Sequence, residues 1–121
     1  MGFDWIKITN AEKDQLIAHK ILLFDCFNTE EGSQWYQSHY NMGHWHYSSD
    51  IKSAIDLINR LSSKNIITEI KVIKTNSFLC RMFHKTLNKK TNFHESHSLP
   101  MAICVATLTY FETEITNKKR A

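Results

Sequence analysis

The segment HYSSDIKSAIDLINRL, residues 46–61, decides the fold, because it passes from an aromatic loop into a helix with a single apolar face. Ser48 or Ser49 is expected to cap this helix, since a serine oxygen accepts a free N–H of the first turn. The apolar side chains recur at the spacing of one stripe on an α-helix: Ile51, Ala54, Ile55, Ile58 and Leu61. The segment therefore predicts an amphipathic helix over residues 49–62.

An antiparallel hairpin over residues 66–84 is predicted to follow this helix. Asn65 suits the left-handed position that ends a helix. Residues 66–74 are rich in isoleucine, valine and threonine, which favour strands. Ile70 and Val72 are expected to lie on a buried face. In the partner strand, alternation separates two faces: Phe78, Cys80 and Met82 on one, and Leu79, Arg81 and Phe83 on the other.

Two further helices are predicted, about 11–24 and 98–112. Thr9 or Asn10 suits the cap of the first helix, and Ser98 with Pro100 suits the start of the second. In the first helix, the expected apolar stripe runs through Leu16, Ile17, Ile21 and Phe24 and is interrupted by Lys20, whose aliphatic stem can lie along it. The last helix is apolar nearly all round, so it is expected to lie against the sheet or in a subunit interface. The fold class is α+β: a small antiparallel sheet packed with three helices as an α/β/α sandwich.

Composition places the chain among ordinary globular domains. It has 121 residues, 42% apolar and 22% charged, which we interpret as a single domain over 1–121. A net charge of +3 is too small to favour duplex DNA as a partner. The sequence has no apolar run of about 18 residues or more, so no membrane span is expected. Cys26, Cys80 and Cys104 show no CxxC pairing, which favours free thiols in a reducing compartment.

Three segments together resemble the phage ABA sandwich domain family. They are YSSDI at 47–51 followed by Ala54, LIAHKI at 16–21, and PMAICVATL at 100–108. The resemblance implies a helix–sheet–helix sandwich of tailed-phage or prophage origin, and hence action in the host cytoplasm. The sequence departs from the family pattern in its histidine-rich loop at 35–47 and in having His19 where glutamate is usual. The family brings no catalytic residues to carry over.

Metal and cofactor binding are not predicted. His44 and His46 share a face if the chain is extended there, with His39 near in sequence, and His94 and His97 form a second pair. Zinc requires three or four ligands of defined geometry. Apart from Glu95, no carboxylate or thiolate stands beside either pair at a familiar spacing, so histidines at the surface are the simpler interpretation.

Catalysis is not predicted either. The sequence contains no GxSxG segment and no glycine-rich phosphate loop. The cysteines lie in apolar segments, where a buried thiol acts as a small apolar side chain rather than a nucleophile. His84 and Glu95 are suitable as an acid–base pair only if the fold brings them together.

A ligand-binding loop is the sharper hypothesis. Aromatic rings in residues 35–47 can stack on a nucleobase, and imidazole and basic groups can contact phosphate oxygens. The candidate binding residues are Trp35, Tyr36, His39, Tyr40, His44, His46, Arg81 and Lys85. The alternative is that the aromatic residues cover the sheet, with Trp45 and Tyr47 packed into the core.

Small phage accessory proteins without catalytic motifs often antagonise bacterial immunity, which is an inference from class rather than from residues. The leading hypothesis is a non-enzymatic homo-oligomer that sequesters a cyclic nucleotide or ADP-ribose-type immune signal. The apolar terminal helix suggests the self-association. One alternative is a protein-directed inhibitor of a CRISPR or restriction effector, with a bacterial defence protein as partner. Another is a divergent hydrolase.

Overall fold

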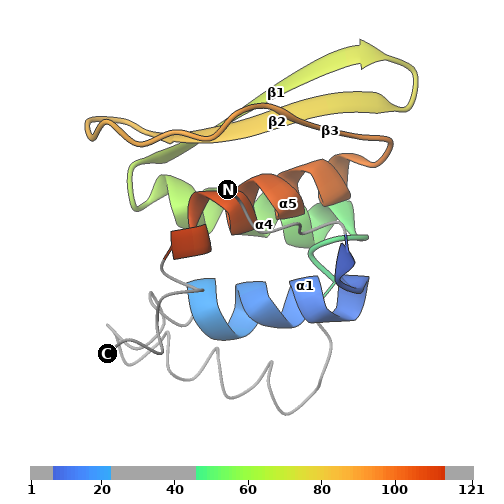
Figure 1. The fold of residues 1–121 in the computed structure, drawn as a ribbon, viewed down its shortest axis with the longest axis horizontal. Helices are drawn as coiled ribbons and strands as arrows, with labels where there is room; N and C mark the ends of the chain where they lie inside the picture. The colour runs from blue at the N-terminus through green and yellow to red at the C-terminus, as the bar shows by residue number, and fades with distance from the viewer. Residues whose placement is uncertain (1–6, 23–45, 114–121) are drawn as a thin grey trace.

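The computed structural model describes residues 7–22 and 46–113 and confirms the α+β class. Three helices, the first of which continues as a π-helix, and one three-stranded sheet make up this part of the chain (Figure 1). In chain order they are α1 Asn10–Leu16, the π-helix η2 Ile17–Leu22, α4 Ile51–Ser62, β1 Ile66–Lys74, β2 Ser77–His84, β3 His94–Ser96 and α5 Leu99–Tyr110.

The layers do not follow the order expected of the sandwich. Within the described residues all helices lie on one face of the sheet, so the order is sheet, then α4 and α5, then α1 with η2 (Figure 1). The physical reason is α5, whose side chains are buried almost all round. Such a helix needs apolar partners on both sides, and here the sheet covers one side while the other helices cover the other.

The sheet has the predicted hairpin as its main part. Its order is β1-β2-β3, with both pairs antiparallel. Asn65 ends α4 with φ 68°, and Asn76 forms the hairpin turn with φ 61°, both in the left-handed region that asparagine tolerates. Cys80 and Met82 of β2 face the helices and are fully buried, which confirms the predicted face of that strand.

The predicted burial of Ile70 and Val72 in β1 is wrong. Their side chains are 37% and 67% exposed, respectively. The hairpin extends beyond the helices at its turn end, so no helix covers that part of the strand (Figure 1). Alternation in sequence shows which residues share a face, but not how far along the strand that face is covered.

Helix α4 is capped by Asp50, not by Ser48 or Ser49. The Asp50 Oδ2 atom accepts the backbone N–H of Ser53 at 2.9 Å. Ser48 has another role: it is buried, and its backbone N–H donates to Oδ1 of Asp14 at 2.8 Å. This hydrogen bond joins the entry of α4 to α1.

The buried face of α4 is rotated from the predicted stripe. Ala54, Leu57 and Leu61 are buried, whereas Ile51 and Ile55 are each 44% exposed. The helix therefore meets the core along one edge of the apolar stripe and leaves the other edge at the surface.

The first helix begins as predicted and then changes its winding. Thr9 caps it in a capping box, with Glu12 accepting the Thr9 N–H at 2.9 Å. From Ile17 the turns are of the wider π type, which rotates later residues around the axis. The predicted stripe is therefore only half correct: Ile17 and Ile21 are buried, but Leu16 and Lys20 are not, and Phe24 lies outside the described residues. Ala18 and Leu22 complete the buried face.

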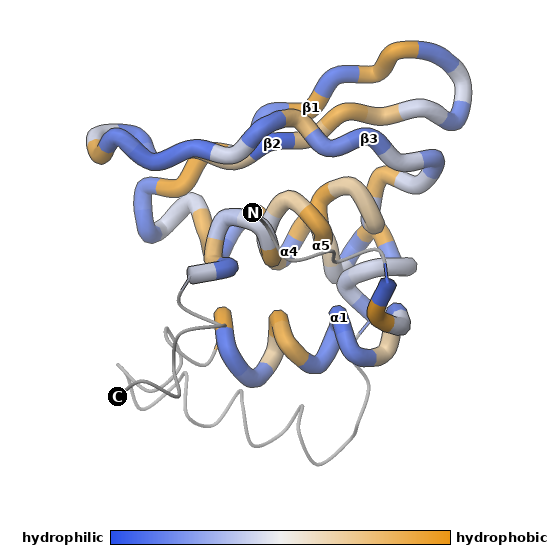
Figure 2. Tube along the Cα trace, in the orientation of Figure 1, coloured by the Kyte–Doolittle hydropathy of each residue, from blue (hydrophilic) through white to orange (hydrophobic). Residues whose placement is uncertain are grey.

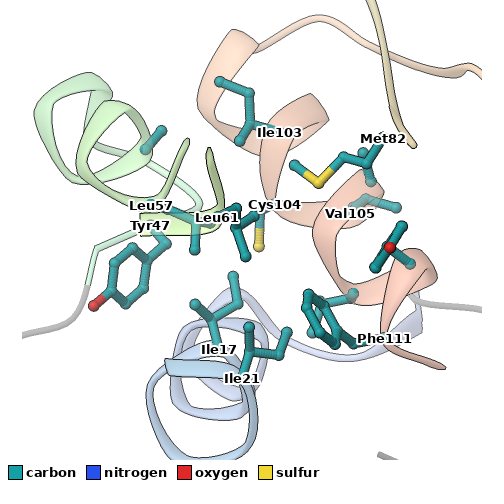
Figure 3. Close-up of a cluster of buried hydrophobic side chains, with 14 of the residues drawn as sticks. Ile17, Ile21, Tyr47, Leu57, Leu61, Met82, Ile103, Cys104, Val105 and Phe111 are labelled. Carbon is teal, nitrogen blue, oxygen red and sulfur yellow. The ribbon is translucent and has the colours of Figure 1, made fainter. Parts of the chain in front are cut away.

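The core gathers around α5. Ser98 caps this helix, and Pro100 stands in its first turn, as predicted. Cys104 of α5 lies near the centre of the cluster, among side chains that include Leu61 of α4 and Ile17 of η2 (Figure 3). Tyr47 is also buried in this core, as its alternative interpretation requires. The hydropathy along the chain agrees, since α5 is largely apolar while the connection before β3 is polar (Figure 2).

The bond between Asp14 and Ser48 predicts a specific loss of stability. The Asp14→Ala variant leaves a buried N–H without its acceptor, so we expect a loss of about 1–3 kcal/mol in the free energy of unfolding. Asp14→Asn retains an oxygen at the same place and should lose much less. Urea denaturation measures both. Asp56→Ala, which removes the exposed partner of Arg60, is the matched control and should change stability by no more than about 0.5 kcal/mol. Equal losses for the alanine and asparagine variants would contradict this role of Asp14.

Candidate functional site

The structure describes only some of the predicted binding residues. Five of them lie outside the described residues and stay a prediction: Trp35, Tyr36, His39, Tyr40 and His44. Of the described ones, His46 precedes α4, and its carbonyl accepts the N–H of Asp50 at 2.8 Å. Lys85 follows β2, and its N–H donates to the carbonyl of Asn65 beyond the other end of α4. His46 and Lys85 are therefore about 18 Å apart along the helix.

Arg81 points to the outer face of the sheet and already has partners. Its Nε donates to Oε1 of Glu69 at 2.7 Å, across the β1–β2 pair. Its guanidinium carbon also lies 4.7 Å from the centre of the Phe93 ring. The structure does not bring Arg81, His46 and Lys85 together into one site.

A different group of residues does surround a cavity. A pocket of about 560 Å³ lies between α1, β3 and α5, within the range of small-molecule sites. Its lining combines polar groups with an apolar floor from α5: Asn10, Lys13, His94, Glu95, Ser96, His97, Met101 and Val105.

Lys13 is the unusual member of this lining. Its side chain is only 3% exposed, and its Nζ donates to the carbonyl of Ile8 at 3.0 Å. Lys13 makes no ion pair with a carboxylate within residues 7–22 and 46–113. A lysine ammonium has three N–H donors, so one bond to a carbonyl does not satisfy it. The buried Asp14 carboxylate is near enough to interact with Lys13 by charge, but it makes no direct ion pair with the Lys13 ammonium among the described residues. A buried cation without a carboxylate in direct contact is costly, and an anion in the pocket would offset that cost.

Two histidines lie in the lining of the pocket, His94 and His97. Burial lowers the pKa of His94, and the positive charge of Lys13 lowers it further. The Nδ1 atom of His97 lies 3.0 Å from the carbonyl oxygen of Asn76, so the ring is anchored to the hairpin turn. Glu95 brings one negative charge to the rim, where its Oε2 accepts the hydroxyl of Ser77 at 2.7 Å. The arrangement suits a ligand that carries phosphate groups on an apolar body.

Two other hollows are less suited to a ligand of this kind. One, of about 460 Å³, runs along α1 and includes His19 and Lys20. The other, of about 190 Å³, lies beside the end of β2 and is lined by Arg81, Lys89 and Lys90. The first is mainly apolar, and the second is smaller than typical small-molecule sites.

The acid–base pair considered from the sequence does not form. Glu95 stands opposite Leu79, whereas His84 stands opposite Ile66 at the other end of β2. The Nδ1 atom of His84 instead accepts the backbone N–H groups of Thr86 and Leu87. The described part of the chain also shows no group of three or more His, Cys, Asp or Glu side chains arranged to hold a metal ion.

The fold and the pocket define a small α+β domain in which a buried lysine lines a cavity. The chain belongs to the phage ABA sandwich domain family, whose model matches residues 15–108. Comparison with curated proteins and with solved structures found no match. Within the described ranges, no helix is long and apolar enough to cross a membrane.

Sequence reasoning identified His94 and His97 only as a metal pair and missed Lys13. The available signal was local: Lys13 falls one turn before Ile17, on the same side of the helix. A charged residue on an apolar side is normally interpreted as a side chain that reaches solvent. In the folded chain, α5 and β3 pack over the Lys13 side chain and keep it from reaching solvent.

The thiols of Cys80 and Cys104 are predicted to be unreactive in the folded protein. Burial raises the pKa of Cys80 to about 12 and raises the pKa of Cys104 as well. Iodoacetamide at pH 8 followed by peptide mass spectrometry should leave both cysteines unmodified, and urea should make both reactive. Rapid labelling of either one in the native protein would contradict the packing around α5.

Proposed function

We propose that this phage protein is a non-enzymatic binder that sequesters an anionic, nucleotide-derived immune signal in the cytoplasm of the bacterial host. The ligand class is a cyclic nucleotide or an ADP-ribose derivative. The observation that carries the proposal is Lys13, a buried lysine without a carboxylate partner among the described residues, in a pocket of about 560 Å³. The family supports the phage setting.

The chemistry of the lining fits such a ligand. Lys13 can donate to a phosphate oxygen, and His94 and His97 can contribute further donors when protonated. Met101 and Val105 offer an apolar floor to a base or ribose. Asn10 and Ser96 supply neutral polar groups, which are suited to recognition of a base edge or a ribose hydroxyl.

Binding without turnover is favoured by the placement of the reactive groups. The thiols of Cys80 and Cys104 are buried, and His84 lies far from Glu95 along β2. A hydrolase would need a base and a nucleophile converging on one point of the cavity. Sequestration requires only that the protein bind the ligand tightly and release it slowly.

The decisive variant is Lys13→Met, which keeps the apolar stem and removes the charge. Calorimetric titration of the full chain with cyclic di- and trinucleotides and with ADP-ribose should show binding of at least one compound. We expect the variant to bind it roughly tenfold more weakly or worse, because a charge-assisted hydrogen bond is lost. The bound compound should be recovered intact by mass spectrometry.

Lys85→Met is the matched control, since this exposed lysine belongs to the sequence-predicted site but not to the pocket. Circular dichroism must show that both variants fold. Weakening by Lys85→Met but not by Lys13→Met would place the ligand elsewhere. A wild-type protein that binds none of the compounds, or that cleaves the one it binds, would contradict the proposal.

Binding should also depend on pH in a defined direction. The pKa of His94 is lowered in the free protein, so the ring is neutral at pH 7.5. A bound anion favours the imidazolium and raises this pKa, so affinity should rise as pH falls through the pKa of the complex. A cyclic dinucleotide is a suitable probe, because its phosphodiester charge is constant in this range. His94→Gln should flatten the profile. His84→Gln, at the far end of β2, should leave it unchanged.

A further inference from the structure

The terminal helix cannot supply the self-association suggested by its sequence, because α5 is buried inside the monomer. The exposed apolar surface lies elsewhere. Of the six large hydrophobic side chains exposed among the described residues, five belong to α4 and β1, which pack against each other. They are Ile51, Ile55, Ile70, Val72 and Ile73.

Strand β1 ends the sheet in the order β1-β2-β3, so within the described residues one of its sides has no strand partner. The carbonyl of Asn65 accepts the N–H of Lys85, so the odd-numbered residues of β1 direct their backbone groups toward β2. The even-numbered ones, Thr68, Ile70 and Val72, therefore present N–H and C=O groups at the open side. Such an edge is a template for another strand.

We propose that a second copy of this chain occupies this edge, with the two β1 strands antiparallel about a twofold axis at Ile70. In this register Ile70 faces Ile70 of the partner subunit, and Thr68 faces the partner's Val72. All of these residues have backbone groups that point outward, so the hydrogen bonds can form. The two three-stranded sheets become one continuous sheet.

The charges of β1 select this register over its neighbours. With the axis at Ile70, Glu69 stands opposite the partner's Lys71, and Lys71 stands opposite the partner's Glu69. A shift of the axis to Glu69 would place two glutamates opposite each other, and a shift to Lys71 would pair two lysines. Opposite charges in facing positions stabilise a pair of strands, and like charges destabilise it. The bulge between Val72 and Lys74 then limits the pairing at its end.

Helix α4 extends the apolar surface below the edge. At about 100° per residue, Ile51 and Ile55 follow on the flank beyond Ile58. Leu57 is on the other flank, where it lies close to Tyr47 and above Ile17 of η2 (Figure 3). The isoleucine flank therefore lies on the side of α4 away from η2, and α4 itself packs against β1. A partner strand beside β1 would shield these side chains from water.

A charge-exchange experiment tests the interface. Sedimentation velocity over a wide range of concentration should show a dimer for the wild-type chain. Glu69→Lys and Lys71→Glu each replace two attractive pairs by two repulsive ones, so each should weaken the dimer roughly tenfold or more. An equimolar mixture of the two variants should associate again, because every facing pair is then attractive. Lys85→Glu, away from the edge, should dimerise like the wild type.

Two results with the wild-type chain and the single variants would overturn the proposal. One is a wild-type chain that stays monomeric, and the other is a dimer whose affinity neither substitution changes. Single variants that are monomeric alone and remain so when mixed would also overturn it. Glu69→Lys also removes the ion pair with Arg81, so circular dichroism must confirm its fold. If that variant fails to fold, Lys71→Glu alone must weaken the dimer for the proposal to stand.

Discussion

Burial of α5 on nearly all sides is the constraint on which the rest of the structure depends. An amphipathic helix can rest on a sheet and leave its polar side in water, but α5 has almost no polar side. It must therefore lie between two layers, and a chain of this size has only its small sheet and its other helices to supply them. Even its buried threonine is satisfied within the helix, since the Thr107 hydroxyl donates to the carbonyl of Ile103 at 2.8 Å. The layer order follows from this requirement.

The same constraint produces the pocket. Because α1 and η2 must cover α5, the polar start of α1 is brought against β3 and the first turns of α5. Lys13 and Asp14 are buried as a consequence, although neither would be expected in a core. Asp14 is offset by a hydrogen bond to the backbone of Ser48. Among the described residues, the hydrogen bond that Lys13 makes through its ammonium goes to the carbonyl of Ile8, so the packing leaves a cation beside the cavity.

What could be predicted from the sequence was governed by short-range chemistry. The capping box at Thr9, the left-handed Asn65 and the start of α5 at Ser98 depend on residues within one turn of each other. The rotation of α4, the exposure of Val72 and the burial of Lys13 depend instead on where other elements end. The position of the cap at Asp50, after both serines, also depends on a long-range contact, because the backbone of Ser48 is held against Asp14 of α1. For the candidate site, the sequence alone could identify His94 and His97 as a pair. It could not predict that they share a cavity with Lys13, because that depends on how β3 and α5 pack against α1.

The pocket and the open edge lie at opposite sides of the sheet, which bears on how binding and assembly are related. Strand β3 lines the pocket, and β1 carries the edge, with β2 between them. A dimer formed through β1 would therefore hold its two pockets at the outer ends of the joined sheet, both open to solvent. Neither pocket would need residues of the partner subunit, so ligand affinity should be the same in monomer and dimer. Loss of one property would then leave the other intact, because the two depend on different strands.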